Sequence, residues 1–199
     1  MSLDKILRFV EFTHKFQQVK RVIYANGEDR NENDAEHSYQ LALVGWYLID
    51  VKSLDLDIEK VFKYAIAHDL VEVYAGDTYF HTEDQKLRDS KKKREAEAAE
   101  KIGKQFSEMP ELVKIIEEYE RLESKESKYV YALDKVLPVM NIYLDSGRSW
   151  RREGVTLKMI RTKDEKIRVS SVIEELWREL VEVLELEQME LFVKEKTSE

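Results

Sequence analysis

The stretch YAIAHDLVEVYAGDT, residues 64–78, places His68 and Asp69 side by side within an otherwise apolar helical pattern. Side chains three and four residues apart share one face of a helix, so Glu72 is expected one turn beyond both. Buried ionisable groups are unfavourable unless they are paired or bind a metal. A divalent cation would satisfy all three groups at once. A His-Asp dipeptide on its own would instead indicate a hydrogen-bonded pair in the core or the end of a helix.

The composition predicts a helical protein. Only two prolines and six glycines interrupt the 199 residues, and Glu, Lys, Leu and Ala, which favour helix, are abundant. No long alternating pattern of apolar residues indicates a strand. We therefore expect an all-α fold, a single helical bundle that forms one domain over residues 1–199. Its core should span about residues 5–180, followed by the C-terminal helix and a frayed tail.

Charge and cysteine content exclude several classes of function. The chain has no cysteine, so a thiolate nucleophile and a cysteine-based zinc site are excluded. A net charge of -8 disfavours a broad surface for a nucleic-acid polymer, although local cations or a metal can still bind a small anion in one cleft. No apolar run has the length of a signal-peptide core or a membrane span. We expect a cytoplasmic protein without a membrane partner.

Helices and loops can be placed along the chain from its periodicity. Apolar residues recur at helical spacing in segments 3–16, 37–49, 58–74, 109–122, 127–144 and 167–192. Segment 89–106 is rich in Ala, Glu and Lys, which predicts a long exposed helix. Residues 26–34, 75–86 and 145–156 are expected to be loops, and residues 193–199 a frayed tail. Loops on a rigid helical scaffold are where binding groups tend to lie.

Two further polar residues occur in apolar helical contexts. His37 precedes the run SYQLALVGWYL, and Asp134 lies within YVYALDKVLPVM. Pro138 has no N–H to donate to the carbonyl of Asp134, so we expect the helix to kink or loosen there and to aim Asp134 inwards. Alternatively, DKVLP lies near the start of a helix, where proline is tolerated.

A histidine, a later His-Asp pair and a distant aspartate, each on its own helix, make a pattern that resembles the HD superfamily of metal-dependent phosphohydrolases. The blocks RNENDAEHS (30–38), AHDLVEVYAGDT (67–78) and ALDKV (132–136) are similar to signature blocks of its 5'-nucleotidase and 5'-deoxynucleotidase group. The resemblance covers about residues 5–180. It includes GRSWRREGV (147–155), a segment of the kind that this group carries late in the chain.

The resemblance implies a metal site and its ligands. The implied ligands are His37, His68, Asp69 and Asp134. Two imidazoles and two carboxylates suit Mn, Fe, Co or Zn better than a calcium cage, and Mg is also possible. The alternative for Glu72 is an exposed carboxylate on a helix.

The same resemblance implies roles for residues around the metal. Glu72 and Asp77, with Asp69, would be catalytic and would hold the attacking water or take up its proton. Arg21 would orient the phosphate, and Asp77 and Thr78 would also contact the substrate. The alternative for Arg21 is a basic surface residue beside Lys20.

Hydrolysis of (deoxy)nucleoside 5'-monophosphates to nucleoside and phosphate is the activity that the resemblance implies, in a homodimer. In deoxynucleotide-selective members an aromatic residue follows the phosphate arginine, whereas this chain has Val22, so selectivity for deoxyribose is in doubt. Trp46, at helical spacing among apolar residues, is expected in the core. Trp150 is the better candidate for contacting a base or a partner subunit. Arg30 resembles a residue that braces the loop before His37.

Two other functions remain open on the sequence. The same metal site could serve a phosphodiesterase or a dinucleoside polyphosphate hydrolase. The chain could also be a non-catalytic helical module that binds a metal or a nucleotide. His14 and His81 are expected outside the metal site, in a surface or core position and in a loop-stabilising position, respectively.

Overall fold

Helices make up most of the chain, which confirms the all-α prediction. The structure is a computed structural model that describes residues 2–82 and 84–192. The predicted frayed tail, residues 193–199, lies outside the described residues. The elements are α1 (Leu3–Phe16), β1 (Lys20–Tyr24), β2 (Asn31–Asn33), α2 (Asp34–Lys52), α3 (Ile58–Ala67), α4 (Glu72–Ala75), α5 (Gln85–Gln105), α6 (Pro110–Arg121), α7 (Lys125–Leu144), α8 (Arg148–Glu153), α9 (Leu157–Arg161), α10 (Asp164–Ile167), α11 (Ser171–Leu186) and α12 (Gln188–Leu191).

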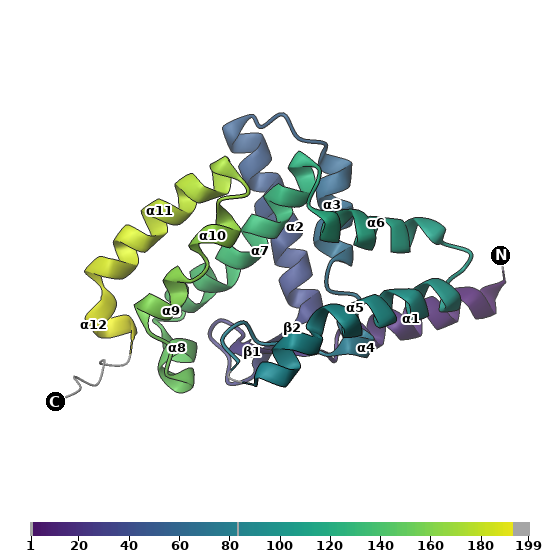
Figure 1. The fold of residues 1–199 in the computed structure, drawn as a ribbon, viewed down its shortest axis with the longest axis horizontal. Helices are drawn as coiled ribbons and strands as arrows, with labels where there is room; N and C mark the ends of the chain where they lie inside the picture. The colour runs from purple at the N-terminus through teal and green to yellow at the C-terminus, as the bar shows by residue number, and fades with distance from the viewer. Residues whose placement is uncertain (1, 83, 193–199) are drawn as a thin grey trace.

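Helices α2 and α7 run through the middle of the molecule (Figure 1). In that view α1, α3, α5 and α6 lie to one side, and α8 to α12 lie to the other. Buried Leu41 and Leu133 belong to the core between the central helices. The hydroxyl of Tyr129 on α7 donates to the backbone oxygen of Gly45 on α2, at 2.8 Å. No helix within the described residues combines the length and apolar character needed to cross a membrane.

The start of α2 is fixed by a reciprocal cap. Asn33 accepts a hydrogen bond from the backbone N–H of Glu36, and the Glu36 side chain accepts from the N–H of Asn33. Such a cap satisfies donors that the first turn of a helix leaves unpaired. Arg30 donates to both carboxylate oxygens of Glu36, at 2.8 and 2.7 Å. Arg30 therefore braces the segment before His37, as the sequence predicted.

A small antiparallel sheet precedes α2, where the sequence showed no strand. Residues Lys20–Tyr24 pair with Asn31–Asn33. Five and three residues are too short for an alternating pattern to stand out from a loop. The sheet matters for the site because β1 carries Arg21.

The His-Asp pair does not continue a helix, which corrects the expected helical pattern over 58–74. Helix α3 ends at Ala67, His68 is its C-cap, and a short turn leads to α4, which begins at Glu72. The N–H of Glu72 donates to the backbone oxygen of Asp69, at 2.9 Å. The pair thus marks a helix end, as one alternative held. Glu72 still lies next to the pair because the turn folds back within four residues.

Helix α7 continues past Pro138 to Leu144, so the alternative that DKVLP lies near a helix start is wrong. Proline is tolerated here inside a long helix, and a kink at this point stays a prediction. The long helix expected over 89–106 is confirmed as α5, and the helical pattern over 109–122 is confirmed as α6, which begins at Pro110. The segment 167–192 is divided between α10, α11 and α12.

Part of the predicted loop 145–156 is a short helix. Gly147 and Gly154, both with positive φ, bound α8. Trp150 on this helix is 1% exposed and stacks on Phe192, with 4.6 Å between ring centroids. The ring is therefore part of the core packing, and an exposed position for it is excluded.

Replacing Gly147 by alanine should destabilise the protein more than the same change at Gly154. Both residues have positive φ, where a Cβ is strained by about 1 kcal/mol or more. A Cβ at Gly147 would also collide with the backbone oxygen of Leu191, whereas nothing lies within 4 Å of one at Gly154. Urea unfolding of Gly147→Ala and Gly154→Ala measures the difference. Equal losses of unfolding free energy would contradict the close approach of α8 and α12.

Candidate metal centre

Four side chains from three separate segments converge in the interior. One ligand atom from each lies within 4.8 Å of all the others. The residues are His37 on α2, His68 and Asp69 at the end of α3, and Asp134 on α7. The structure therefore brings together the four ligands that the resemblance implied.

His68 presents one ring nitrogen to this centre. Its Nδ1–H donates to the backbone oxygen of Ala65, at 3.0 Å, which leaves Nε2 as the inward-facing atom. Nε2 lies 3.1 Å from Oδ2 of Asp69 and 3.7 Å from Oδ1 of Asp134, without hydrogen-bond geometry to either. Burial alone would lower the pKa of His68, but the charges of Asp69 and Asp134 raise it to about 10. A backbone carbonyl that accepts from the other ring nitrogen commonly orients a metal-binding histidine.

His37 is fully buried, and its Nε2 lies 2.9 Å from Oδ1 of Asp134. Burial lowers the pKa of His37 to about 4, and the charge of Arg21 acts in the same direction. The ring is therefore neutral at pH 7, which is the form that binds a metal. Burial opposes ionisation of Asp134, but Lys135 and the two histidines hold its pKa well below the usual range.

A second group of carboxylates adjoins the first. Ligand atoms of Asp34, Asp69 and Glu72 also lie within 4.8 Å of one another. Oδ2 of Asp34 and Oε2 of Glu72 are buried without a hydrogen-bond partner among the described residues. Burial raises the pKa of Glu72 well above its usual value, and the charges of Asp69 and Asp77 raise it further.

The donor set fits a divalent cation. Two buried imidazoles and several carboxylates repel or remain unsatisfied without a positive charge between them. The unpartnered Nε2 of His68 faces the same point as the carboxylates. Imidazole and carboxylate ligands together suit a first-row transition metal. The four residues can hold such an ion, and its identity does not follow from them.

Arg21 reaches the centre from β1. Its Nη1 lies 3.1 Å from Oδ2 of Asp69 and 3.4 Å from Oδ1 of Asp34, and its Nε lies 3.3 Å from Oε2 of Glu32. The alternative of a basic surface residue is wrong, because the side chain is only 15% exposed. Sequence reasoning missed Glu32 on β2 and Asp34, the first residue of α2, because both lie in a segment that was expected to be a loop.

Lys135 was also missed. Its Nζ lies 2.6 Å from Oδ2 of Asp134 and is close to the metal ligands. Burial would lower the pKa of Lys135, but Asp134 raises it. In the sequence, Lys135 is marked only by its place directly after Asp134. A lysine in that position is equally typical of an exposed helix residue.

The centre opens into a cavity of about 720 Å³. Asp77, Thr78 and Val22 line it, as do Arg21 and Glu72. Nucleotide-sized ligands occupy pockets of this size. The Thr78 hydroxyl accepts a hydrogen bond from Arg94, at 2.7 Å, so one of its contacts is already used within the protein.

Trp46 and Trp150, and the histidines that are not predicted ligands, differ in burial and in their distance from the cavity. Trp46 is 48% exposed and packs against Phe62, so the expectation that it belongs to the core is wrong. Trp150 borders the cavity from its buried position. His81 is in the loop that lines the cavity, and burial lowers its pKa to about 4. His14 is exposed on α1, away from the cavity lining.

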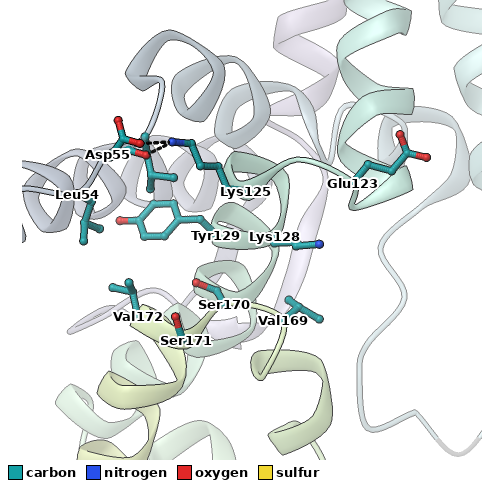
Figure 2. A pocket seen from close by; sticks show the side chains of 11 residues that line it. Leu54, Asp55, Glu123, Lys125, Lys128, Tyr129, Val169, Ser170, Ser171 and Val172 are labelled. Carbon is teal, nitrogen blue, oxygen red and sulfur yellow. Dashed lines mark hydrogen bonds and ion pairs between the residues drawn. The ribbon is translucent and has the colours of Figure 1, made fainter.

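A second hollow of about 440 Å³ lies elsewhere on the molecule, between the α2–α3 connection and the starts of α7 and α11. Figure 2 shows Tyr129 beneath it and Lys125 paired with Asp55 at its edge, at 2.6 Å. It contains none of the residues predicted to be functional. Its lining has no histidine, so it offers no comparable metal centre.

The structure is a helical fold with a buried cluster of histidines and aspartates that could hold a metal ion. The chain belongs to the HD domain family, whose model matches residues 13–177. This match includes all four predicted ligands and α2, α3 and α7, which carry or precede them.

Several known proteins are similar to the chain. The mouse 5'-deoxynucleotidase HDDC2 is 30% identical over 134 residues, which is 65% of this chain and 64% of that protein. The protein of the same name from Dictyostelium discoideum is 28% identical over 150 residues, 71% and 77% of the two chains. The chain thus spans just under two thirds of the mouse relative. A crystal structure of a predicted metal-dependent phosphohydrolase from Magnetospirillum magnetotacticum superposes with a TM-score of 0.80, at 26% identity over 96% of this chain and 98% of the other.

Metal binding at pH 7 should release about one proton per ion, because His68 must give up its Nε2 proton to ligate. The pKa of about 10 also means that His68 stabilises the metal-free protein fully below its ordinary pKa of about 6.5, and that this stabilisation is lost as pH rises through 10. Calorimetric titration with Mn²⁺ in buffers of different ionisation enthalpy gives the proton count. The exposed His14→Gln variant should give the same count, and a heat independent of buffer would contradict the expectation.

Proposed function

We propose that the chain is a metal-dependent phosphohydrolase that converts (deoxy)nucleoside 5'-monophosphates into nucleoside and phosphate. The observation that carries the proposal is the convergence of His37, His68, Asp69 and Asp134 at the base of a large cavity. The family, and relatives named as 5'-deoxynucleotidases, support the same activity.

His37, His68, Asp69 and Asp134 would hold one divalent ion, such as Mn, Co, Fe or Zn, with Mg also possible. Such an ion lowers the pKa of water and polarises a phosphoryl oxygen, and both effects favour hydrolysis of a phosphomonoester. A buried site with fixed ligands strengthens these effects because water competes less for the same charges.

The chain's own residues supply the proton transfer. Glu72 is buried beside Asp69 and has one carboxylate oxygen without a partner among the described residues. Its raised pKa, caused first by burial, suits a general base that takes a proton from the attacking water. Burial also raises the pKa of Asp77, and this residue lines the cavity where it can orient the water or protonate the leaving oxygen.

Arg21 would position the phosphate. Its guanidinium borders the cavity and is held by carboxylates on β2, α2 and the α3–α4 turn. A guanidinium fixed in this way loses little conformational freedom when it binds phosphate oxygens. Thr78 would add a hydroxyl contact to the substrate, and Val22 leaves the wall near the sugar aliphatic rather than aromatic.

Replacing Glu72 by glutamine should lower kcat by about 10²–10⁴ and leave metal content unchanged, because a proton acceptor is lost and the four ligands remain. Asp134→Asn should lose the metal itself. Phosphate released from a panel of nucleoside 5'-monophosphates with Mn²⁺ or Co²⁺, together with the metal content of each variant, measures both effects. The exposed Glu97→Gln on α5 is the matched control.

Two outcomes would contradict this function. Cleavage of a dinucleotide or cyclic nucleotide, with no phosphate freed from any 5'-monophosphate, would point to the phosphodiesterase or dinucleoside polyphosphate alternative. Retention of metal and nucleotide without turnover of any substrate would point to a binding module.

We also propose that the protein is a homodimer that pairs through the outer face of α2. Exposed apolar residues form one stripe along this helix, with spacings of three and four residues. The stripe consists of Tyr39, Leu43, Trp46, Tyr47 and Val51. A large exposed apolar patch typically marks a protein interface. The cytoplasmic location and the single domain over residues 1–199 stay predictions.

Tyr47→Glu should convert the dimer to a monomer, because it places a charge in the apolar stripe. Sedimentation velocity over a range of protein concentrations measures the assembly. Leu186→Glu, at an exposed apolar position on α11, should leave the dimer intact. A wild-type protein that sediments as a monomer at all concentrations would overturn the proposal.

A further inference from the structure

The cations of the cavity include two groups that differ in their partners. Those near the metal centre each have an acidic partner: Arg21 contacts Asp69, and Lys135 contacts Asp134. On α5, Lys91 pairs with Glu95 at 3.3 Å, and the guanidinium of Arg88 donates to the backbone oxygen of Thr82. Lys92, which is exposed on the same helix, also lines the cavity.

The second group lies at α10. Lys163 immediately precedes this helix and Lys166 lies within it, and both line the cavity. Among the described residues, neither takes part in an ion pair. Asp164, the nearest acidic residue in sequence, accepts a hydrogen bond from Trp177 at 2.8 Å and lies 3.7 Å from Arg161. Asp164 is therefore already engaged with Trp177 and Arg161.

Both lysines share one aromatic ring. Nζ of Lys163 lies 4.1 Å from the centroid of Phe80, and Nζ of Lys166 lies 4.6 Å from the same centroid. A ring face attracts an ammonium group, but it offsets only part of the cost of removing that group from water. The two like charges also repel each other across the ring.

Lys163 is only 6% exposed, which is rare for a lysine without an acidic partner. Burial first, and then the charges of Lys135 and Lys166, lower the pKa of Lys163 to about 7. A bound anion would offset both the loss of hydration and the repulsion between the cations. Phe80 comes from the loop after α4, so the ring and the two lysines reach this part of the cavity from different segments of the chain.

We propose that Lys163 and Lys166, over the ring of Phe80, form a second anion subsite in the cavity, which takes a second phosphate group of the nucleotide. The inference rests on the proposed function, because the first phosphate is the one at the metal centre and Arg21. The cavity, at about 720 Å³, has room for a nucleotide that carries both groups. The second phosphate can come from a 3'-phosphate or from a 5'-diphosphate chain, since both present the same anionic oxygens.

Kinetics on the metal-loaded protein test this subsite. We expect kcat/KM for adenosine 3',5'-bisphosphate to be at least about tenfold higher than kcat/KM for adenosine 5'-monophosphate. Alternatively, the competitive inhibition constant of adenosine 5'-diphosphate should be at least about tenfold lower than the KM of adenosine 5'-monophosphate. The arm that shows the gain identifies where the second phosphate is attached. Lys163→Met should reduce the gain towards one, and Lys163→Arg should retain it.

Controls separate this subsite from general effects. Lys158→Met removes an exposed lysine from neighbouring α9 and should leave the ratio between substrates unchanged. Lys166→Met, at an exposed position, carries the same expectation as Lys163→Met if that variant does not fold. Hydrolysis of the monophosphate with no gain in either arm, or a gain that survives both methionine variants, overturns this inference alone. Failure to release phosphate from either substrate overturns the proposed function and this inference together.

Discussion

Mutual repulsion among buried carboxylates is the constraint on which the rest of the site depends. Asp34, Asp69, Glu72 and Asp134 lie within one small region, and among the described residues the cations in contact with them are Arg21, Lys135 and the protonated His68. Burial and the charge of Asp69 raise the pKa of Asp34 to about 7, and the same two causes raise the pKa of Glu72 well above its usual value. A divalent ion would reduce this repulsion, with the two histidines as ligands. The same arrangement would serve the proposed chemistry, because a carboxylate with a raised pKa can take up a proton from water.

The scaffold meets this constraint by placing the charges on rigid elements. Helices α2 and α7 supply one predicted ligand each, and the turn at the end of α3 supplies two. The cap formed by Asn33 and Glu36 fixes where α2 begins, one turn before His37. The small sheet is the least regular part of the fold, yet it delivers Arg21. The cavity then lies where these elements meet the loop after α4, so substrate contacts and metal contacts come from different parts of the chain.

Sequence reasoning predicted the helical fold and the four converging residues because both leave strong local patterns. Helical periodicity marked α1, α6 and α7. Polar residues within apolar runs singled out the four residues, and the resemblance to the HD superfamily implied that they are ligands. It failed where the decisive contact is non-local. Helix α3 ends at Ala67 within a continuous helical pattern, and Trp46 has the spacing of a core residue but is half exposed. The acids around Arg21 come from three separate elements, and the one on β2, Glu32, lies on a strand too short to recognise. Lys163 is not distinguished from a surface lysine until the fold buries it against Phe80.

Diffraction from crystals of the protein loaded with Mn²⁺, recorded at the manganese absorption edge, tests the central claim most directly. The account predicts an anomalous peak between the side chains of His37, His68, Asp69 and Asp134, within ligand distance of all four. Manganese-loaded crystals that show these side chains ordered but no anomalous peak between them would contradict it.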